Sequence, residues 1–304
     1  MSAYLFVHFT SDNTGDKESI WFSISRDGLN WTDLGTDTPL LSSKSGTTGI
    51  RDPFIIYDEK AKKYFIIATD LLTKSGNWGD FANRGSRSLL VWESEDLINW
   101  SSERLIEVGI PKAGCVWAPE AVFCKEKDMW FVFWASCVKE DGDEEPKQRI
   151  YGAFTKDFQE FTPTFKYIDA PTAIIDTNIV WDNGWYYRFS KDETNKFIIV
   201  ERSQELVSEN YESVYSEVLA NFYGLEGPEA FYIDDMQKWC LIADQYHAHL
   251  GYTPFLCNDL ASGEFVQLHN DQFDMGKRKK RHGGILKISD ELADKLIEHY
   301  GISE

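Results

Sequence analysis

The chain has 304 residues, of which 50 are acidic and 31 are basic, so its formal net charge at pH 7 is −19. This balance argues against nucleic-acid binding, because contacts with phosphates need clustered Lys and Arg side chains. The one basic run, "GKRKKRH" at 276–282, is flanked by acidic sequence and is expected to be a solvated loop. No apolar run is long enough to span a bilayer, so we expect neither nucleic acid nor a membrane as a partner.

The amino-terminal residues "MSAYLFVHFTSDNTG" lack the basic start, apolar stretch and small-residue cleavage site of a secretory signal. The cysteines are odd in number and include no CxxC pair. They are Cys115, Cys124, Cys137, Cys240 and Cys257. Because stable disulfides form in oxidising compartments, this pattern favours reduced, buried thiols in a cytoplasmic protein.

The predicted elements are almost all strands, because the apolar runs are short, rich in β-branched and aromatic residues, and separated by short turns. The first two runs are 4–10 and 20–31. Further runs follow in groups of three, at 51–58, 63–70 and 88–100, at 116–123, 129–136 and 149–161, at 175–181, 184–190 and 197–206, and at 226–233, 238–246 and 250–260. The last elements are a strand at 282–289 and an amphipathic helix at 290–300, with Asp290 near its start.

Runs that recur with a period of some tens of residues are typical of repeat folds. We interpret each group of three as the inner part of a blade that ends in a fourth edge strand. The first two runs have no first strand of their own, and the run at 282–289 supplies one. The sequence therefore predicts an all-β, five-bladed β-propeller, formed by residues 1–304 as one domain and closed by amino- and carboxy-terminal strands in one blade.

A polar turn followed by an aromatic residue recurs after the third strand of several units. It reads "SRDGLNW" at 25–31, "SEDLINW" at 94–100 and "TKDFQEF" at 155–161. We expect the acidic residue to cap a tight turn and the aromatic residue to pack between neighbouring blades. The repetition is therefore interpreted as structural.

Chemically informative residues stand at the starts of the predicted innermost strands: Asp52, Asp176, Glu226, His282 and Trp117. A single Asp before Pro is commonly a turn cap. The innermost strands converge on one axis, however, so these side chains are expected to face one another across a pocket. Carboxylates confined together raise one another's pKa values, and this cost favours a catalytic role for the three acidic residues.

Three carboxylates without a nucleophilic Ser or Cys fit glycoside hydrolysis. One carboxylic acid protonates the leaving oxygen, and a second carboxylate activates water on the opposite face of the sugar. A third can tune and orient the acid. Aromatic side chains such as Trp78, Trp117 and Trp134 are candidates to enclose the sugar.

Five motifs carry a resemblance that covers nearly the whole chain. They are "RDPFIIYD" (51–58), "CVWAPEAVF" (115–123), "IIDTNIVWDNGWYYRFS" (174–190), "LEGPEAFYI" (225–233) and "RHGGILKIS" (281–289). In order and spacing they resemble glycoside hydrolase family 43, which comprises five-bladed propeller enzymes that act on arabinose- and xylose-containing glycans. The third motif departs from the family in having "DTN" where many members have Asp-Pro-Ser, but the Asp is kept.

The resemblance implies a role for each carboxylate. Asp52 would be the general base, Asp176 the pKa modulator and Glu226 the general acid. The family inverts configuration, so the carboxyl groups of Asp52 and Glu226 are expected roughly 6.5–9.5 Å apart. The resemblance also allows a structural calcium ion near His282, bound through water, although the chemistry requires no cofactor.

The expected reaction is the release of one terminal pentose from a plant-type oligosaccharide. We place α-L-arabinofuranose first, with β-D-xylose and β-D-galactofuranose as alternatives within the family. The candidate substrate-binding residues are Arg51, Asp70, Trp78, Trp117, Asn178, Gln245, His247 and Arg281. The loop at 71–88 is expected to wall the channel and so to decide between exo and endo action.

Two other functions remain open. Glycoside hydrolase family 32, which acts on fructans and sucrose with retention, shares the propeller and an Arg-Asp-Pro motif. Its Asn-Asp-Pro-Asn-Gly-like and Glu-Cys motifs do not occur in this chain. A non-catalytic carbohydrate-binding propeller is the other alternative, and it would be expected to have lost an acid or a base. The oligomeric state is left open.

Overall fold

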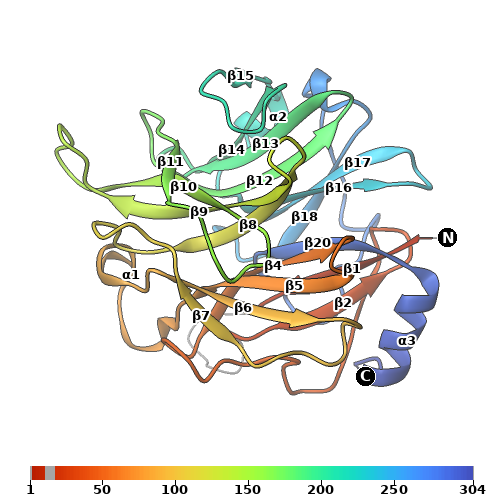
Figure 1. Ribbon diagram of the computed structural model, residues 1–304. Helices are drawn as coiled ribbons and strands as arrows, with labels where there is room; N and C mark the ends of the chain where they lie inside the picture. The colour runs from red at the N-terminus through yellow and green to blue at the C-terminus, as the bar shows by residue number, and fades with distance from the viewer. Residues whose placement is uncertain (1, 11–17, 304) are drawn as a thin grey trace.

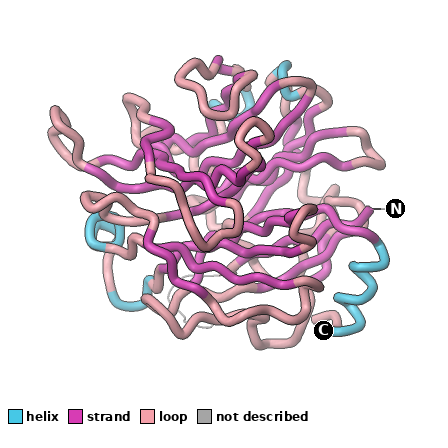
Figure 2. Tube along the Cα trace, viewed as in Figure 1, coloured by secondary structure: helices cyan, strands magenta, loops and turns pink. Residues whose placement is uncertain are grey.

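The computed structural model describes residues 2–10 and 18–303. Within these ranges, five antiparallel sheets of four strands each are arranged as blades around a central axis (Figure 1). Figure 2 shows that strands dominate and that the few short helices lie at the periphery. The prediction of an all-β, five-bladed propeller is confirmed.

We number the blades from I to V. Their strands, from the axis outwards, are β4 Ile50–Asp58, β5 Lys63–Asp70, β6 Ser88–Ser94 and β7 Arg104–Glu107 in blade I; β8 Trp117–Cys124, β9 Met129–Val138, β10 Lys147–Thr155 and β11 Phe165–Ile168 in blade II; β12 Ile174–Asp182, β13 Trp185–Asp192, β14 Phe197–Ser203 and β15 Glu212–Ser213 in blade III; β16 Glu226–Ile233, β17 Lys238–Asp244, β18 Tyr252–Cys257 and β19 Val266–Gln267 in blade IV; and β20 Gly283–Ser289, β1 Ser2–His8, β2 Trp21–Ser25 and β3 Trp31–Asp33 in blade V. Contacts between the inner strands of successive blades close the ring.

Blade V joins the two ends of the described chain. Its inner strand β20 pairs antiparallel with β1, in a register that runs from Ser2 opposite Ser289 to His8 opposite Gly283. Figure 1 shows the helix that follows β20, α3 (Asp290–Tyr300), beside the amino-terminal strand. The Ser289 side chain caps α3 by accepting the N–H of Leu292. Both the closing blade and this helix are as predicted.

The hydrophobic core lies between the blades. It consists of five clusters of buried residues, each built from two neighbouring blades. In the cluster between blades V and I, for example, Leu5 and Phe22 pack with Ile66 and Trp92. Every sheet is therefore apolar on both faces, which explains why the strands read as continuous apolar runs.

The recurring polar turn has the structural role expected of it. Asp96 accepts two backbone N–H groups through Oδ1, at 2.9 and 2.7 Å. Asp27 and Asp157 do the same in the equivalent turns. The aromatic residue that ends the turn reaches the adjacent blade, as Trp100 of blade I does against Phe22 of blade V, with ring centroids 6.2 Å apart.

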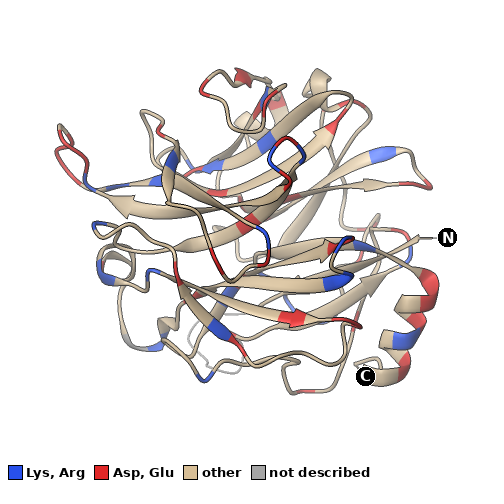
Figure 3. Cartoon of the chain, viewed as in Figure 1, with Lys and Arg blue, Asp and Glu red and all other residues tan. Residues whose placement is uncertain are grey.

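The prediction of a solvated loop at 276–282 is right for Lys277 and Lys279, which are exposed, but wrong for Lys280. Lys280 is 1% exposed, and its Nζ lies 2.6 Å from Oδ1 of Asp33. The guanidinium of Arg278 lies over the ring of Trp21, 4.4 Å from its centroid. Lys280 is buried because it balances the charge of Asp33, which is buried in blade V and needs a cation beside it. Figure 3 shows the remaining Lys and Arg residues dispersed among acidic ones in this view.

All five cysteines are buried and free, as expected, while a cytoplasmic location stays a prediction. Within residues 2–10 and 18–303, no helix has the length and apolar character needed to cross a bilayer. Two short helices were not predicted: α1 (Trp78–Arg84), which lies in the loop between β5 and β6, and α2 (Glu217–Ala220).

Candidate active site

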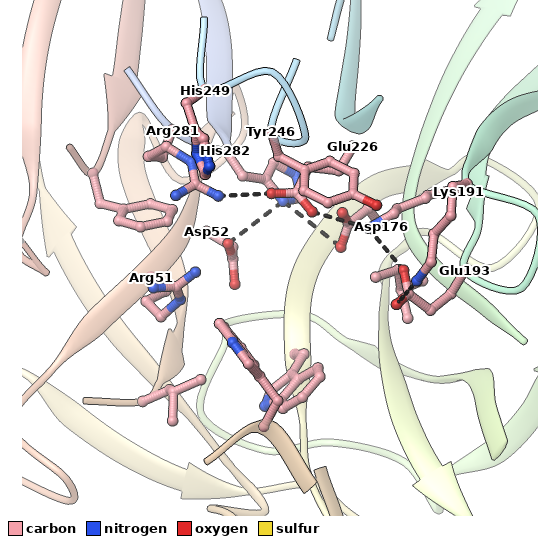
Figure 4. A pocket seen from close by; sticks show the side chains of 16 residues that line it. Arg51, Asp52, Asp176, Lys191, Glu193, Glu226, Tyr246, His249, Arg281 and His282 are labelled. Atoms are coloured by element: carbon pink, nitrogen blue, oxygen red, sulfur yellow. Dashed lines mark hydrogen bonds and ion pairs between the residues drawn. The ribbon is translucent and has the colours of Figure 1, made fainter. Parts of the chain in front are cut away.

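A cavity of about 360 Å³ opens where the inner strands of the five blades begin (Figure 4). Asp52, Asp176 and Glu226 all line it. The other lining residues are Phe9, Arg51, Leu71, Trp78, Trp117, Ile175, Lys191, Glu193, Lys196, Tyr246, His249, Arg281 and His282. The structure thus brings the three predicted carboxylates together in one pocket.

Four of the five inner strands share a β-bulge close to the pocket. In β4, β8, β12 and β16 the pairing with the second strand of the blade shifts by a residue near the start of the strand. The residue at the bulge has a positive φ, of +47°, +47°, +49° and +53° at Asp52, Ala118, Asp176 and Gly227 respectively. Bulges re-aim side chains beside active sites, and here they turn two carboxylates into the cavity. For a residue other than Gly this conformation costs roughly 1–2 kcal/mol.

The three carboxylates do not occupy equivalent positions, contrary to our expectation. Asp52 and Asp176 stand at the bulge, whereas Glu226 stands one residue before it. Glu226 is therefore the counterpart of Arg51, Trp117 and Ile175 in the other blades. Its longer side chain approaches the cavity from a different backbone position, and this gives it different neighbours.

Asp52 lies in a setting that favours its ionised form. Its Oδ2 accepts a hydrogen bond from Oγ1 of Thr69 at 2.9 Å, and its Oδ1 lies 3.5 Å from Nδ1 of His282. Burial raises the pKa of Asp52, but His282, Arg51 and Thr69 together lower it below its usual value. A carboxylate in this state is suited to accept a proton.

The carboxyl group of Asp176 loses its proton less readily than that of Asp52. Its Oδ2 accepts the backbone N–H of Gly227 at 3.1 Å. Burial raises the pKa of Asp176 to about 6, because the charges of Glu226 and Asp52 add to the effect of burial and the cation at His282 offsets it only in part. This carboxyl group therefore titrates close to neutral pH.

His282 connects the carboxylates. Its Nδ1 lies 3.5 Å from Oδ1 of Asp52 and 3.9 Å from Oδ1 of Asp176, while its Nε2 lies 3.8 Å from Oε1 of Glu120. Burial lowers the pKa of His282, but the surrounding carboxylates raise it well above its ordinary value. The side chain is thus a buried cationic group between three carboxyl groups.

Both oxygens of Glu226 are paired with cations. Its Oε2 accepts a hydrogen bond from Nζ of Lys191 at 2.9 Å, and its Oε1 accepts one from the guanidinium of Arg281 at 2.7 Å, as Figure 4 shows. Burial raises the pKa of Glu226, yet the charges of Lys191 and Arg281 lower it below its usual value. These contacts therefore favour the ionised form of Glu226.

A second polar layer lies beneath His282. The side-chain amide of Asn178 donates to Oε2 of Glu120 and to Oε2 of Glu229, at 2.8 Å each, and the N–H of Ile285 donates to Oε1 of Glu229 at 2.8 Å. Burial raises the pKa of Glu120 to about 7 and that of Glu229 well above its ordinary value. This layer supports the imidazole from below.

Half of the predicted substrate-binding residues line the cavity: Arg51, Trp78, Trp117 and Arg281. The guanidinium of Arg51 lies 4.5 Å from the ring centroid of Phe9 and 5.3 Å from that of Trp78. Trp78 is 53% exposed, and its ring meets Trp117 edge-on at 6.0 Å. Since Trp78 begins α1, the loop at 71–88 does form part of the wall.

The other half lie outside the cavity: Asp70, Asn178, Gln245 and His247. Asp70 is buried, and its Oδ1 accepts the N–H and the hydroxyl of Thr47 at 2.7 and 2.8 Å. Asn178 belongs to the layer beneath, and exposed His247 packs against Tyr223 with ring centroids 5.0 Å apart. Trp134, which is 1% exposed, belongs to the core.

The sequence analysis missed Lys191, Tyr246, Glu193, Lys196 and His249. Lys191 stands near the end of β13, opposite Ile175 of β12 in the ladder. Its place near the end of a second strand, beside the start of an inner strand, is the one signal that points to it, and no motif accompanies it. Lys196 and His249 come from turns, whose position follows from register and not from motif.

The described residues provide no group of direct side-chain ligands for a metal, and a calcium ion bound through water near His282 stays a prediction. No group of three or more His, Cys, Asp or Glu side chains within 2–10 and 18–303 is arranged to hold a metal. Both nitrogens of His282 face carboxylates, which is the surrounding of an imidazolium and not that of a neutral imidazole ligand. We therefore assign no step to a metal.

Fold and pocket together define the class of the protein as a glycoside hydrolase propeller. Residues 1–294 match the family model of a "Probable glycosyl hydrolase domain", related to glycoside hydrolase family 43, and the chain belongs to this family. It is 31% identical over 240 residues to an α-L-arabinofuranosidase of Bifidobacterium longum subsp. longum. That match covers 70% of this chain but only 22% of the relative, so the chain spans about a fifth of that protein.

Solved structures share the fold at low sequence identity. A thermostable family-43 glycoside hydrolase superposes with a TM-score of 0.54 and 18% identity, over 75% of this chain and 74% of the other. The catalytic domain of a family-62 α-L-arabinofuranosidase of Coprinopsis cinerea gives a TM-score of 0.57 at 14% identity, over 83% and 77% of the two chains. At these identities the likeness concerns the fold alone.

Proposed function

We propose that this chain hydrolyses glycosidic bonds with inversion and releases one terminal α-L-arabinofuranose from an oligosaccharide. The observation that carries the proposal is the meeting of Asp52, Asp176 and Glu226, from three blades, in one cavity beside a cationic His282. Family membership supports hydrolysis, and the α-L-arabinofuranosidase named above supports the choice of sugar. β-D-Xylose and β-D-galactofuranose are the alternatives within the family.

The two ends of the reaction need carboxyl groups in opposite states. Asp52, which is ionised, takes a proton from the water that attacks the anomeric carbon. Glu226 gives its proton to the glycosidic oxygen as the bond from that oxygen to the anomeric carbon breaks. Asp176, with a pKa of about 6, adjusts the field between them. Each turnover consumes one water and moves one proton at each end.

The size and walls of the cavity favour exo action. Its volume of about 360 Å³ is near the lower end of the range of roughly 300–1,000 Å³ found for ligand sites. One sugar ring would fill the polar floor, and the next would meet the exposed face of Trp78 at the rim. A polymer threaded through the site would instead need an open groove.

The test is hydrolysis of aryl furanosides, aryl pyranosides and unactivated oligosaccharides by the wild type and by Glu226→Gln. We expect the variant to lose roughly 10²–10⁴-fold in kcat on the oligosaccharide, and less on aryl glycosides, whose leaving groups need little protonation. Glu201→Gln is the matched control, because Glu201 is also paired with an arginine, Arg188, but lies away from the cavity. Near-normal turnover of the oligosaccharide by Glu226→Gln would overturn the assignment of the acid.

Stereochemistry and binding separate the remaining alternatives. Proton NMR of the first-formed sugar should show the inverted anomer, and a retained anomer would favour the mechanism of glycoside hydrolase family 32. Binding of a glycan without turnover at any pH would favour the carbohydrate-binding propeller.

A further inference from the structure

Lys191 is placed between two carboxylates of the pocket. Its Nζ lies 2.9 Å from Oε2 of Glu226 and 2.7 Å from Oε2 of Glu193, and it stands 4.1 Å from the ring centroid of Tyr246. The side chain is only 3% exposed. The ammonium group is therefore paired with both carboxylates, and its contact with Glu226 has the geometry of a hydrogen bond.

This arrangement conflicts with the work of a general acid. A general acid must hold a proton and must approach the leaving oxygen, but both oxygens of Glu226 are occupied by cations. One of the two cations must therefore withdraw before the reaction. Arg281 is anchored, because its Nε also donates to Oδ2 of the buried Asp244 at 2.6 Å.

Lys191 is the cation that can withdraw. Its ammonium group ends a flexible stem, unlike a guanidinium fork that is fixed by two partners. Glu193 already stands within ion-pair distance, and its Oε2 accepts no hydrogen bond from any residue that the structure describes. If Nζ moves a short way from Glu226, Lys191 stays paired with Glu193 and Glu226 stays paired with Arg281. No buried charge is then left unpaired.

We propose that Lys191 is a positioning residue that is shared between Glu226 and Glu193 in the free protein and that pairs with Glu193 alone once substrate is bound. The leaving-group oxygen competes for Oε2 of Glu226, and Glu226 takes up a proton from solvent when Lys191 has moved. The inference rests on the proposed function of Glu226 as the acid. The new element is that Glu226 becomes protonated only after substrate has bound.

The pH dependence of such a switch has several contributors. Glu226 faces Lys191 from β13, Arg281 from the segment before β20 and Asp176 from β12, while Asp244 of β17 lies behind Arg281. Glu193 is further paired with Lys196. Among these groups Lys191 alone has two carboxylate partners in the pocket and a flexible stem.

The experiment compares the pH profile of kcat/KM for the wild type, Lys191→Met and Glu193→Gln on an unactivated oligosaccharide. The alkaline limb of this profile reports the pKa of the acid in the free enzyme. Removing the charge of Lys191 should move that limb to higher pH by roughly one unit or more, since an opposite charge at this distance lowers a carboxyl pKa by about 1–3 units. Glu193→Gln should move it to lower pH, because Lys191 then has only Glu226 as its carboxylate partner.

Control variants distinguish a failure of the role proposed for Lys191 from a failure of the role proposed for Glu226. Lys191→Arg keeps the charge and should keep the limb near its wild-type position, and Lys63→Met removes a lysine paired with Glu93 outside the pocket and should leave it unchanged. If Lys191→Met does not fold, the direction of the shift in Glu193→Gln decides. A limb that stays in place, or that moves the same way in both variants, overturns the role of Lys191. An active Glu226→Gln would instead overturn the assignment of the acid.

Discussion

The buried ion pair between Lys280 and Asp33 should be a principal support of the active site, and Lys280→Met tests this. The lysine side chain is 0% exposed and that of Asp33 2%, and their charged atoms are 2.6 Å apart. Lys280 directly precedes Arg281 and His282 in the chain. Its loss should therefore affect both stability and catalysis.

The size of the effect follows from what would remain around Asp33. Removing one partner of a buried pair costs about 3–5 kcal/mol, because the other charge stays buried. Asp33 would keep hydrogen bonds from the hydroxyl of Ser23 and the N–H of Arg278, at 2.7 Å each, which places the cost near the lower value of about 3 kcal/mol. For a chain of this size that corresponds to a fall in Tm of roughly 6 °C.

Thermal and denaturant unfolding of Lys280→Met beside Lys279→Met would measure the effect. Lys279 is the exposed neighbour that binds only the carbonyl of His249, so its replacement should change the free energy of unfolding by less than about 0.5 kcal/mol. The double variant Asp33→Asn, Lys280→Met should recover part of the loss, because no charge then remains buried. Equal melting of the two lysine variants would refute the reasoning.

Two further predictions concern pH. Thr69→Val should move the acidic limb of the pH profile of kcat/KM to higher pH, because Asp52 loses a hydrogen bond that favours its ionised form. Thr69→Ser keeps the hydroxyl and should keep the limb in place. Identical limbs in the two variants would contradict this. Burial and the charge of Lys280 lower the pKa of His8 to about 3. Below pH ~6.5 His8 is protonated in the unfolded chain but stays neutral in the folded chain. The free energy of unfolding should therefore fall by up to ~1.4 kcal/mol per pH unit as the pH drops towards 3. Denaturant titrations should show a flatter profile for His8→Gln, and a wild-type slope for the exposed His269→Gln; an unaltered slope in His8→Gln would count against a neutral buried His8.

The sequence predicted those features that depend on short-range pattern. The strands could be predicted because every blade face is apolar. Asp52, Asp176 and Glu226 could be predicted as pocket residues because each stands near the start of an inner strand. The helix at 290–300 follows from its apolar spacing, and the structure has it at the same residues.

What could not be predicted depends on register and on burial of charge. Nothing in the sequence around Lys191 marks it as a pocket residue, because it reaches the cavity only through its pairing opposite Ile175. The position of Glu226 before the bulge depends on backbone torsion and not on spacing. Lys280 was expected in solvent, since a run of basic residues gives no sign that one of them meets a buried carboxylate from the other end of the chain.

The pairing of β1 with β20 determines when the catalytic pocket can first exist. Within this chain β1 is synthesised long before its inner partner β20, so one edge of a largely apolar strand stays unpaired until β20 and the residues between the two strands have been translated. At about 5–20 residues per second this delay is long compared with the pairing of a single hairpin. Until β20 pairs with β1, the ring of blades is open and one edge of β1 is exposed, and the pocket is complete only when β20 has joined blade V.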